Sequence, residues 1–205
     1  MGSGVDNAAP ATVAIIKYNA GNIQSVLYAL ERIGVKAIVT DNVTEIRSAS
    51  KVIFPGVGEA STAMNYLRER GLDIIIKDLT QPVLGICLGM QLMCQHSEEN
   101  DTPCLGIFDS TVKKFIATEQ CKVPQVGWNK IKNTSGSLFQ GLENGSYCYF
   151  VHSYYAGLCN NTIAITEFTT EFSSALRKNN FYGVQFHPEK SASIGETILK
   201  NFISL

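Results

Sequence analysis

The stretch GICLGMQ at residues 85–91 holds Cys87 between two glycines, each one residue away. The apolar run PVLGI before it predicts a buried strand, and residues 88–97 are typical of a helix. A strand that turns into a helix through Gly-x-Cys-x-Gly is the sulfur counterpart of a nucleophile elbow, whose sharp, strained turn requires small neighbours. The helix start favours a thiolate at Cys87, and the N–H of Leu88 can bind an oxyanion. The structural alternative is a cysteine buried in a tight turn.

A thiolate nucleophile needs a base, and the chain has three histidines. We expect His96, late in the helix after the cysteine, to lie at the surface, whereas His152 in FVHSYY either lines a site or packs. His187 precedes Pro188, which favours extended backbone for the histidine. In extended backbone residues i and i+2 share a side, so Glu189 can fix the tautomer of the His187 imidazole. The pattern favours a Cys–His–Glu triad over a plain polar loop.

Strands and helices alternate in the first half of the chain. Apolar runs predict strands at residues 12–18, 35–40, 51–55 and 82–86. Helices are expected from Asn22 to a stop at Gly34, over about residues 60–70, and over residues 88–97. Alternation at such short spacing predicts parallel strand pairing in an α/β layer fold.

The second half has a different texture, with short strands and little helix between them. The predicted strands are TVKKFIA, KVPQVGWNKI, SYCYFVHSYY, TIAITEF, SSALRKN and FYGVQFH. Residues 195–204 are expected to form a closing helix. We expect one domain over residues 12–205, preceded by a flexible leader or tag at residues 1–11.

Composition excludes several functional classes. Of 205 residues, 45% are hydrophobic and 17% charged, and the formal net charge is −1, so no basic excess indicates a nucleic-acid partner. No apolar run is long enough to span a bilayer, and no signal peptide is recognisable. The six cysteines include no CxxC pair, which favours reduced thiols in a cytoplasmic protein over disulfides or a structural zinc site. No metal or cofactor is expected.

GICLGMQ and GVQFHPE, about a hundred residues apart, together resemble the signatures of the triad-type, class I glutamine amidotransferases. YNAGN, FPGVGE, PQVGWN and YFVHSYY narrow the resemblance to the glutaminase subunits of imidazole glycerol phosphate synthases. The resemblance covers essentially the whole chain after the leader. It implies a three-layer, flavodoxin-like fold with a mostly parallel central sheet, helices on both faces, and extra antiparallel strands in the second half.

The resemblance also implies a reaction. The Cys87 thiolate attacks the side-chain carboxamide of glutamine, His187 moves the protons, and Glu189 orients His187; a cysteinyl thioester forms and is hydrolysed. Leu88 N–H is one oxyanion donor, and we expect Val57 N–H in PGVGE to be the second. Glycines on both sides of Val57 allow this peptide to face the wrong way at rest and to turn when a partner binds its ligand. The alternative is an ordinary Gly-rich turn.

Further residues match family positions that bind glutamine or contact a partner. Those for glutamine are Gly56, Gly58, Gln91, Glu99, Ser153 and Tyr154. The implied partner is a (β/α)₈-barrel cyclase, in a heterodimer whose interface involves Asn19, Trp128, Tyr149 and Lys190. The cyclase takes ammonia and makes imidazole glycerol phosphate and an aminoimidazole carboxamide nucleotide in histidine biosynthesis. Structural alternatives are an exposed helix position for Gln91, a solvated acidic loop for Glu99, and core packing for Trp128.

Other functions are compatible with part of the pattern. A paralogous glutaminase can feed ammonia to another synthase, such as a surface-sugar amidation enzyme, with the same triad. A cysteine hydrolase or thiol-based stress protein shares the elbow but does not need HPE or PQVGWN. A non-catalytic binding module on this fold would lack the nucleophile or the base, and both are present here.

Overall fold

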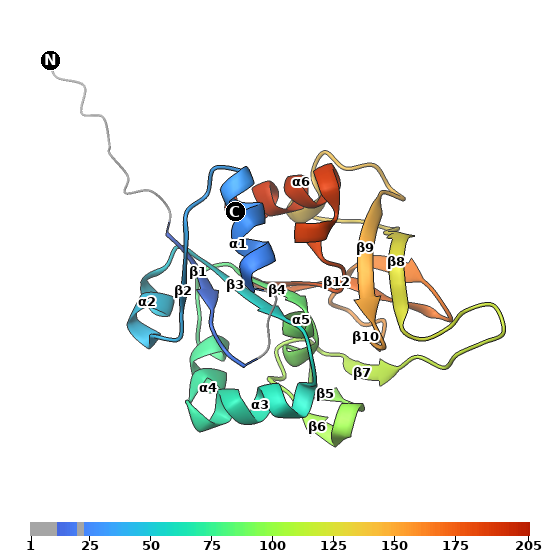
Figure 1. Ribbon diagram of the computed structural model, residues 1–205, viewed down its shortest axis with the longest axis horizontal. Coiled ribbons are helices and arrows are strands. Elements are labelled where there is room, and N and C mark those ends of the chain that lie inside the picture. The colour runs from blue at the N-terminus through green and yellow to red at the C-terminus, as the bar shows by residue number, and fades with distance from the viewer. Residues whose placement is uncertain (1–11, 20–22) are drawn as a thin grey trace, which may run out of the picture.

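The computed structural model describes residues 12–19 and 23–205 (Figure 1). The leader expected at residues 1–11, and residues 20–22 of the YNAGN turn, lie outside the described residues.

A seven-stranded sheet forms the centre of the fold (Figure 1). Its strands are β1 (Val13–Ile16), β2 (Ala37–Thr40), β3 (Lys51–Gly56), β4 (Val83–Cys87), β11 (Thr162–Glu167), β12 (Glu171–Lys178) and β13 (Phe181–Val184). Their order across the sheet is β11-β12-β13-β4-β3-β1-β2. The strands from β13 to β2 pair in parallel, whereas β12 and β11 add antiparallel at one edge. The expected α/β class, mostly parallel with extra antiparallel strands in the second half, is confirmed.

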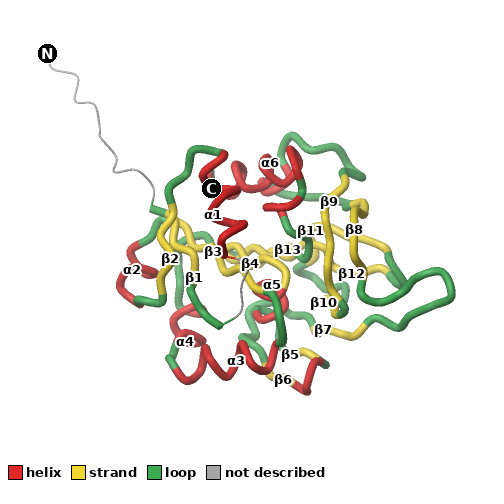
Figure 2. Tube along the Cα trace, in the orientation of Figure 1, coloured by secondary structure: helices red, strands yellow, loops and turns green. Residues whose placement is uncertain are grey.

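Helices cover both faces of this sheet, as Figure 2 shows in red. They are α1 (Ile23–Arg32), α2 (Val43–Ser48), α3 (Ala60–Glu69), α4 (Leu72–Lys77), α5 (Leu88–Leu92) and α6 (Ala192–Ile203). One core cluster joins the sheet to α1 and α6 through side chains such as Leu30 and Phe202, and the other joins it to α2–α5 through Ile46 and Met64. Since β1 and β4 are buried along their whole length, their sequences are continuously apolar. The expected three layers are confirmed.

Smaller elements lie beside the second half of the sheet. A four-stranded sheet in the order β10-β7-β5-β6 consists of β10 (Tyr154–Ala156), β7 (Thr111–Lys114), β5 (His96–Ser97) and β6 (Thr102–Pro103). An antiparallel ribbon pairs β8 (Gln125–Lys130) with β9 (Tyr147–His152). Single 3₁₀ turns are η1 (Glu99–Asp101), η2 (Ser137–Phe139) and η3 (Pro188–Lys190). Across residues 12–19 and 23–205, no helix has both the length and the apolar character needed to cross a membrane.

The helix after the elbow is shorter than predicted. It ends at Leu92, and residues 96–97 are β5 instead of its last turn. Backbone N–H groups of the segment 105–107 bond the carbonyls of residues 92–94, so a neighbouring loop takes the acceptors that a longer helix would use itself. The closing helix α6 begins at Ala192, before the predicted start, and the sequence pattern predicts neither α2 nor α4.

The two glycines around Cys87 are required by packing. A Cβ on Gly89 would overlap the backbone carbonyl of Phe54 in β3, and a Cβ on Gly85 would overlap Met93 and lie 2.8 Å from Met90 N. The helix α5 therefore lies directly on the backbone of the sheet, because side-chain-free positions permit it. The expectation that both neighbours must be small is confirmed.

Replacing Gly89 should destabilise the fold sharply, because a Cβ there meets backbone that cannot move independently. We expect Gly89→Ala to lower the free energy of unfolding by about 3 kcal/mol in urea denaturation. Gly157→Ala is the matched control, since a Cβ at Gly157 makes only ordinary contacts, the nearest at 3.7 Å. Equal unfolding midpoints for the two variants would contradict the packing argument.

Candidate active site

Cys87 lies at the junction of β4 and α5 in a strained conformation. Its backbone angles are φ 53° and ψ −109°, a combination that residues with a Cβ rarely adopt. The side chain is 6% exposed and reaches a pocket, so the sulfur is mostly desolvated yet accessible. The predicted elbow is confirmed in its geometry.

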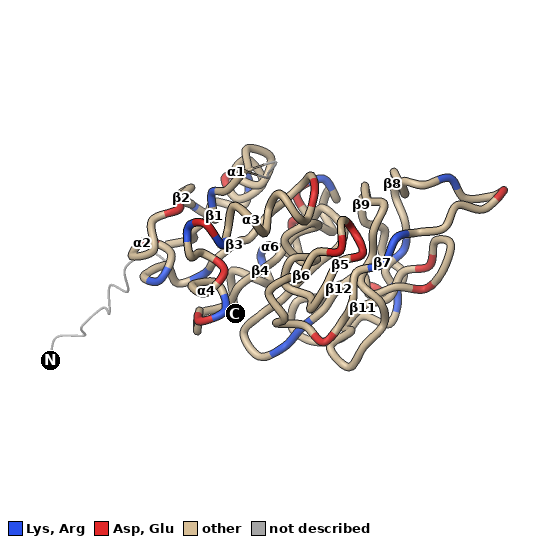
Figure 3. Tube along the Cα trace, turned by 90° about the horizontal axis from the view of Figure 1, so that it is seen from below, with Lys and Arg blue, Asp and Glu red and all other residues tan. Residues whose placement is uncertain are grey.

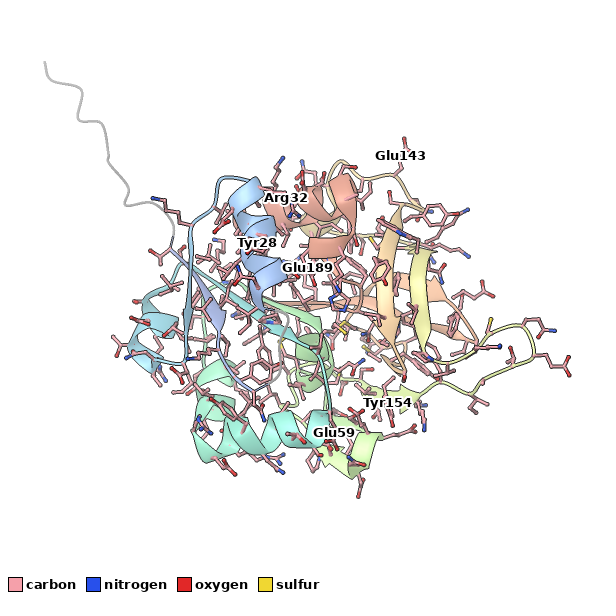
Figure 4. All side chains as sticks on the ribbon, in the orientation of Figure 1. Tyr28, Arg32, Glu59, Glu143, Tyr154 and Glu189 are labelled. Carbon is pink, nitrogen blue, oxygen red and sulfur yellow. The ribbon has the colours of Figure 1, made fainter. Side chains whose placement is uncertain are left out.

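His187 and Glu189 form a buried ion pair beside the elbow. Nδ1 of His187 lies 2.7 Å from Oε1 of Glu189, and both side chains are at most 2% exposed. Pro188 holds His187 extended, at φ −99° and ψ 97°, as predicted. The prediction that Glu189 shares this extended segment is wrong, because Glu189 belongs to the 3₁₀ turn η3. The turn still returns its carboxylate to the imidazole, and Figure 4 labels Glu189 beside α1 and α6, the helices that η3 contacts.

The sheet explains why residues so distant in sequence meet. The parallel neighbours β4 and β13 end side by side, with Val184 paired to Ile86. Because the two strands are parallel, the chain leaves both of them at their carboxyl ends, on the same side of the sheet. Binding sites commonly lie beside the carboxyl ends of parallel strands. Cys87 is the last residue of β4, and His187 comes shortly after the end of β13.

The charges of the site favour a protonated His187. Burial lowers the pKa of His187, but the neighbouring Cys87 and Glu189 outweigh it and raise the pKa to about 10. Nε2 of His187 is buried without a hydrogen-bond partner among the described groups, and the effect of Cys87 on the pKa of this ring comes first from its charge. This leaves Nε2 as the nitrogen that can exchange a proton with a ligand.

A pocket of about 280 Å³ opens over the sulfur. It is lined by Val57, Gly58, Cys87, Leu88, Gln91, Glu99, Val151, His152, Ser153 and Tyr154. This set contains most of the residues expected to bind glutamine or an oxyanion. Gly56 is not among the lining residues: a Cβ there would overlap the buried hydroxyl of Tyr18, so packing behind the wall requires this glycine. Gly58 instead has a φ of +107°, which favours glycine.

Glu99 places a carboxylate at the rim of the pocket. Oε2 accepts a 2.8 Å hydrogen bond from Ala60 N at the start of α3, which fixes the side chain. Burial raises the pKa of Glu99, while the bond from Ala60 opposes the shift. Glu98 and Asp101 are close to Glu99 in the chain, and Figure 3 shows acidic residues, in red, next to β5. This rim suits a positively charged group on a ligand, and Glu99 is not simply part of a solvated loop.

Gln91 is buried in the wall of the pocket, so the alternative of an exposed helix glutamine is wrong. It is 5% exposed, and its Nε2 donates to Tyr154 O at 2.8 Å and to Gln185 Oε1 at 2.9 Å. Because Nε2 is occupied, the carbonyl oxygen Oε1 is the atom left for a ligand. The predictions did not include Gln185, although its place two residues before His187 is a usable signal in extended backbone.

His152 both lines the pocket and packs. Burial lowers its pKa to about 4, and its ring lies among Phe115, Phe150 and Phe172. The imidazole is therefore neutral, and Nδ1 lies 2.7 Å from Tyr154 O, to which it donates as the N–H tautomer. His96, by contrast, pairs with Asp101 and is not among the pocket-lining residues.

Three of the four residues expected at a partner interface lie together on the β8–β9 ribbon and η3. Trp128 is 53% exposed, which rules out the core-packing alternative, and its ring lies edge-on to Tyr149 at 6.0 Å between centroids. Nζ of Lys190 lies 5.9 Å from the Tyr149 ring. The carbonyl of Tyr149 accepts a 2.9 Å bond from His187 N, so this surface is tied to the candidate base. Asn19, also exposed, instead donates to Thr62 O in α3.

All six cysteines have free thiols. Among the residues that the structure describes, no group of histidine, cysteine, aspartate and glutamate side chains is arranged to hold a metal ion.

Comparisons with known proteins agree with this geometry. The family model "Glutamine amidotransferase class-I" matches residues 14–205. The imidazole glycerol phosphate synthase subunit HisH of Bacteroides thetaiotaomicron is 56% identical over 194 residues, covering 94% of this chain and 99% of the relative. HisH of Pectobacterium atrosepticum is 46% identical over 195 residues, with 94% and 99% covered.

A solved structure shares the fold at low sequence identity. A putative GMP synthase protein from Thermoplasma acidophilum superposes with a TM-score of 0.74 at 20% identity, covering 96% of this chain and 94% of that one. With 56% identity over nearly the whole length of a HisH relative and the matching family model, the chain belongs to the class-I glutamine amidotransferase family, in its HisH group.

Proposed function

We propose that this chain hydrolyses L-glutamine to glutamate and ammonia at Cys87, and that it delivers the ammonia to a cyclase subunit. The observation that carries the proposal is the strained Cys87 at the pocket, with the buried His187–Glu189 pair beside it. A desolvated sulfur next to a cationic imidazole is the arrangement that nucleophilic attack on an amide requires.

The reaction proceeds in two halves. The Cys87 thiolate attacks the side-chain carboxamide carbon and the C–S bond forms. The C–N bond then breaks as His187 Nε2 protonates the departing amide nitrogen, which leaves as ammonia. Water then attacks the thioester, His187 takes its proton, and glutamate leaves as the thiolate is restored. Glu189, hydrogen-bonded to Nδ1, keeps the tautomer and stabilises the charged ring.

Two backbone donors stabilise the tetrahedral oxyanion. Leu88 N–H follows the sulfur directly, and Val57 N–H completes the pair once its peptide turns. Val57 is 39% exposed at the pocket, and Gly58 beside it has the conformational freedom for such a turn. Each such donor contributes about 10²–10³ in rate in comparable enzymes.

Glutamine fits the polar groups of the pocket. The Glu99 carboxylate binds the α-ammonium group, and Oε1 of Gln91 accepts from the substrate. Ser153 and Tyr154 form the facing wall, Gly58 lets the backbone approach, and Gly56 supports Val57 from behind. This assignment is supported by the fact that these residues line one pocket of about 280 Å³. Gly56 is the exception, because it packs against Tyr18 behind the pocket wall.

The ammonia acceptor is a (β/α)₈-barrel cyclase in a heterodimer, acting in histidine biosynthesis. Ammonia released into neutral water becomes mostly ammonium, so direct transfer preserves its nucleophilicity. The relatives are named as synthase subunits, which supports a partner. Exposed Trp128 is a suitable anchor for it, together with Tyr149, Lys190 and Asn19.

Removing the sulfur of Cys87 should abolish glutamine hydrolysis without affecting synthesis from ammonium salts. We expect Cys87→Ala to lower glutamine hydrolysis by more than about 10³-fold, because no nucleophile remains. With the cyclase and its nucleotide substrate, synthesis from ammonium salts should continue at the wild-type rate. Both rates are measured by product formation, and glutamine-dependent turnover that survives the substitution would refute the assignment.

The charge of Cys87 should be visible in the titration of His187. Cys87 raises the pKa of His187, so Cys87→Ala should move the titration midpoint of His187 downward from about 10. The three histidine ring signals are followed by ¹H–¹³C NMR, with the signal of His96, which is not among the pocket-lining residues, as reference. An unchanged His187 titration in the variant would mean that the sulfur does not interact with this ring.

Partner binding should activate hydrolysis, because Val57 N–H completes the oxyanion site only after its peptide turns. We expect hydrolysis by the isolated chain to rise by about 10²–10³-fold when the cyclase and its nucleotide ligand are added. A rate already maximal in the isolated chain would exclude the turning peptide.

A surface variant tests the docking face in the same assay. Trp128→Ala should require a higher cyclase concentration for half-maximal activation, since an exposed aromatic anchor is lost. Tyr28→Ala is the matched control, because Tyr28 is 55% exposed on α1, outside the β8–β9 ribbon.

A further inference from the structure

We propose that Gln185 is a catalytic residue whose side-chain N–H stabilises the thiolate of Cys87, and that a relay of buried amides fixes its orientation. The proposal rests on the nucleophilic role of Cys87 proposed above. It adds a second side chain that acts on the sulfur, besides His187.

The fold brings Gln185 beside the sulfur. It is the residue after β13, and because Val184 pairs with Ile86, Gln185 stands next to Cys87. Its backbone N–H donates to Ser174 O at 2.9 Å, which holds it in line with β12. The side chain is 0% exposed, and Nε2 lies 3.7 Å from Sγ of Cys87, within hydrogen-bond distance for sulfur.

The direction of each amide follows from one backbone carbonyl. Tyr154 O can only accept, so Gln91 must present Nε2 to it, at 2.8 Å. The same Nε2 also donates to Gln185 at 2.9 Å, so Gln185 must present Oε1 there. Only Nε2 of Gln185 then remains for the sulfur.

Reversing the amides would leave buried groups without partners. If Gln185 alone turned, its Nε2 would meet Nε2 of Gln91, two donors face to face, and its oxygen would meet the sulfur. If Gln91 turned as well, its oxygen would face Tyr154 O, which already accepts from His152 at 2.7 Å. Buried polar groups without partners are disfavoured, so the relay has one stable direction.

This arrangement favours negative charge on the sulfur. A hydrogen bond to the charged form of a group stabilises that form, and it shortens and strengthens when the acceptor becomes an anion. The sulfur is an anion before it attacks glutamine and again when the thioester breaks. Gln185 keeps its protons in both steps, whereas His187 exchanges one.

Alkylation of Cys87 by iodoacetamide measures this effect without glutamine. The rate is followed against pH by mass spectrometry of the peptide that contains Cys87. In Gln185→Met the pH of half-maximal rate should rise by about one unit, and the rate at neutral pH should fall about tenfold. For glutamine hydrolysis kcat should fall while KM stays unchanged.

The other titratable groups near the sulfur are unaltered in this variant. His187 and Tyr18 interact with Cys87 through charge, Glu189 stands behind His187, and His152 and Glu99 share its pocket. A shift of the alkylation profile therefore reports the lost donor.

Ser174→Ala is the matched control. Ser174 is fully buried next to Gln185 and its hydroxyl makes no hydrogen bond with the described residues, so this variant should keep the wild-type alkylation profile. If Gln185→Met does not fold, the isosteric variant Gln185→Glu provides the test. Its pH of half-maximal alkylation should rise by more than about one unit, because an oxygen then faces the sulfur. A wild-type profile in the folded variant overturns the proposal. That result is distinct from glutamine hydrolysis surviving in Cys87→Ala, which would overturn the triad instead.

Discussion

The direct packing of α5 on the backbone of β3 and β4 is the constraint on which the rest of the site depends. With no Cβ at Gly85 and Gly89, the helix starts almost without an intervening loop, and the backbone of Cys87 must adopt φ 53°. The strain is held by the surrounding core and not by the cysteine itself. Cys87, the proposed nucleophile, thereby lies at the carboxyl end of the central strand β4, where the pocket opens.

The parallel sheet supplies everything else that acts on the sulfur. Because β13 lies beside β4, the residues that leave β13 arrive at Cys87 in a fixed order, first Gln185 and then His187. Glu189 follows in η3, against α6, α1 and β9, in a setting that excludes water from the ion pair. The environment of the Cys87 sulfur therefore combines three features: the strained backbone of Cys87, the neighbouring position of β13, and the burial of the His187–Glu189 pair.

The sequence allows prediction of those features that depend on local chemistry. Apolar runs predict the parallel strands, the Gly-Cys-Gly spacing predicts the elbow, and Pro188 predicts the conformation of His187. The end of α5 could not be predicted, because the loop that takes its last carbonyls is distant in sequence. The direction in which the Gln185 amide faces depends on contacts with residues on other elements, which its place in the sequence does not reveal. Glu189 was predicted correctly as the partner of His187, but through the wrong backbone geometry.

The hydrogen bond from His187 N to Tyr149 O joins the outer β8–β9 ribbon to the candidate triad. It is made by main-chain atoms alone, so substitutions at position 149, and substitutions other than proline at position 187, leave the donor and the acceptor in place. The backbone of β9 and the backbone that carries the His187 ring are therefore joined without any side chain in between. Side chains on the exposed face of the ribbon can accordingly differ to suit a different partner while this main-chain bond is kept.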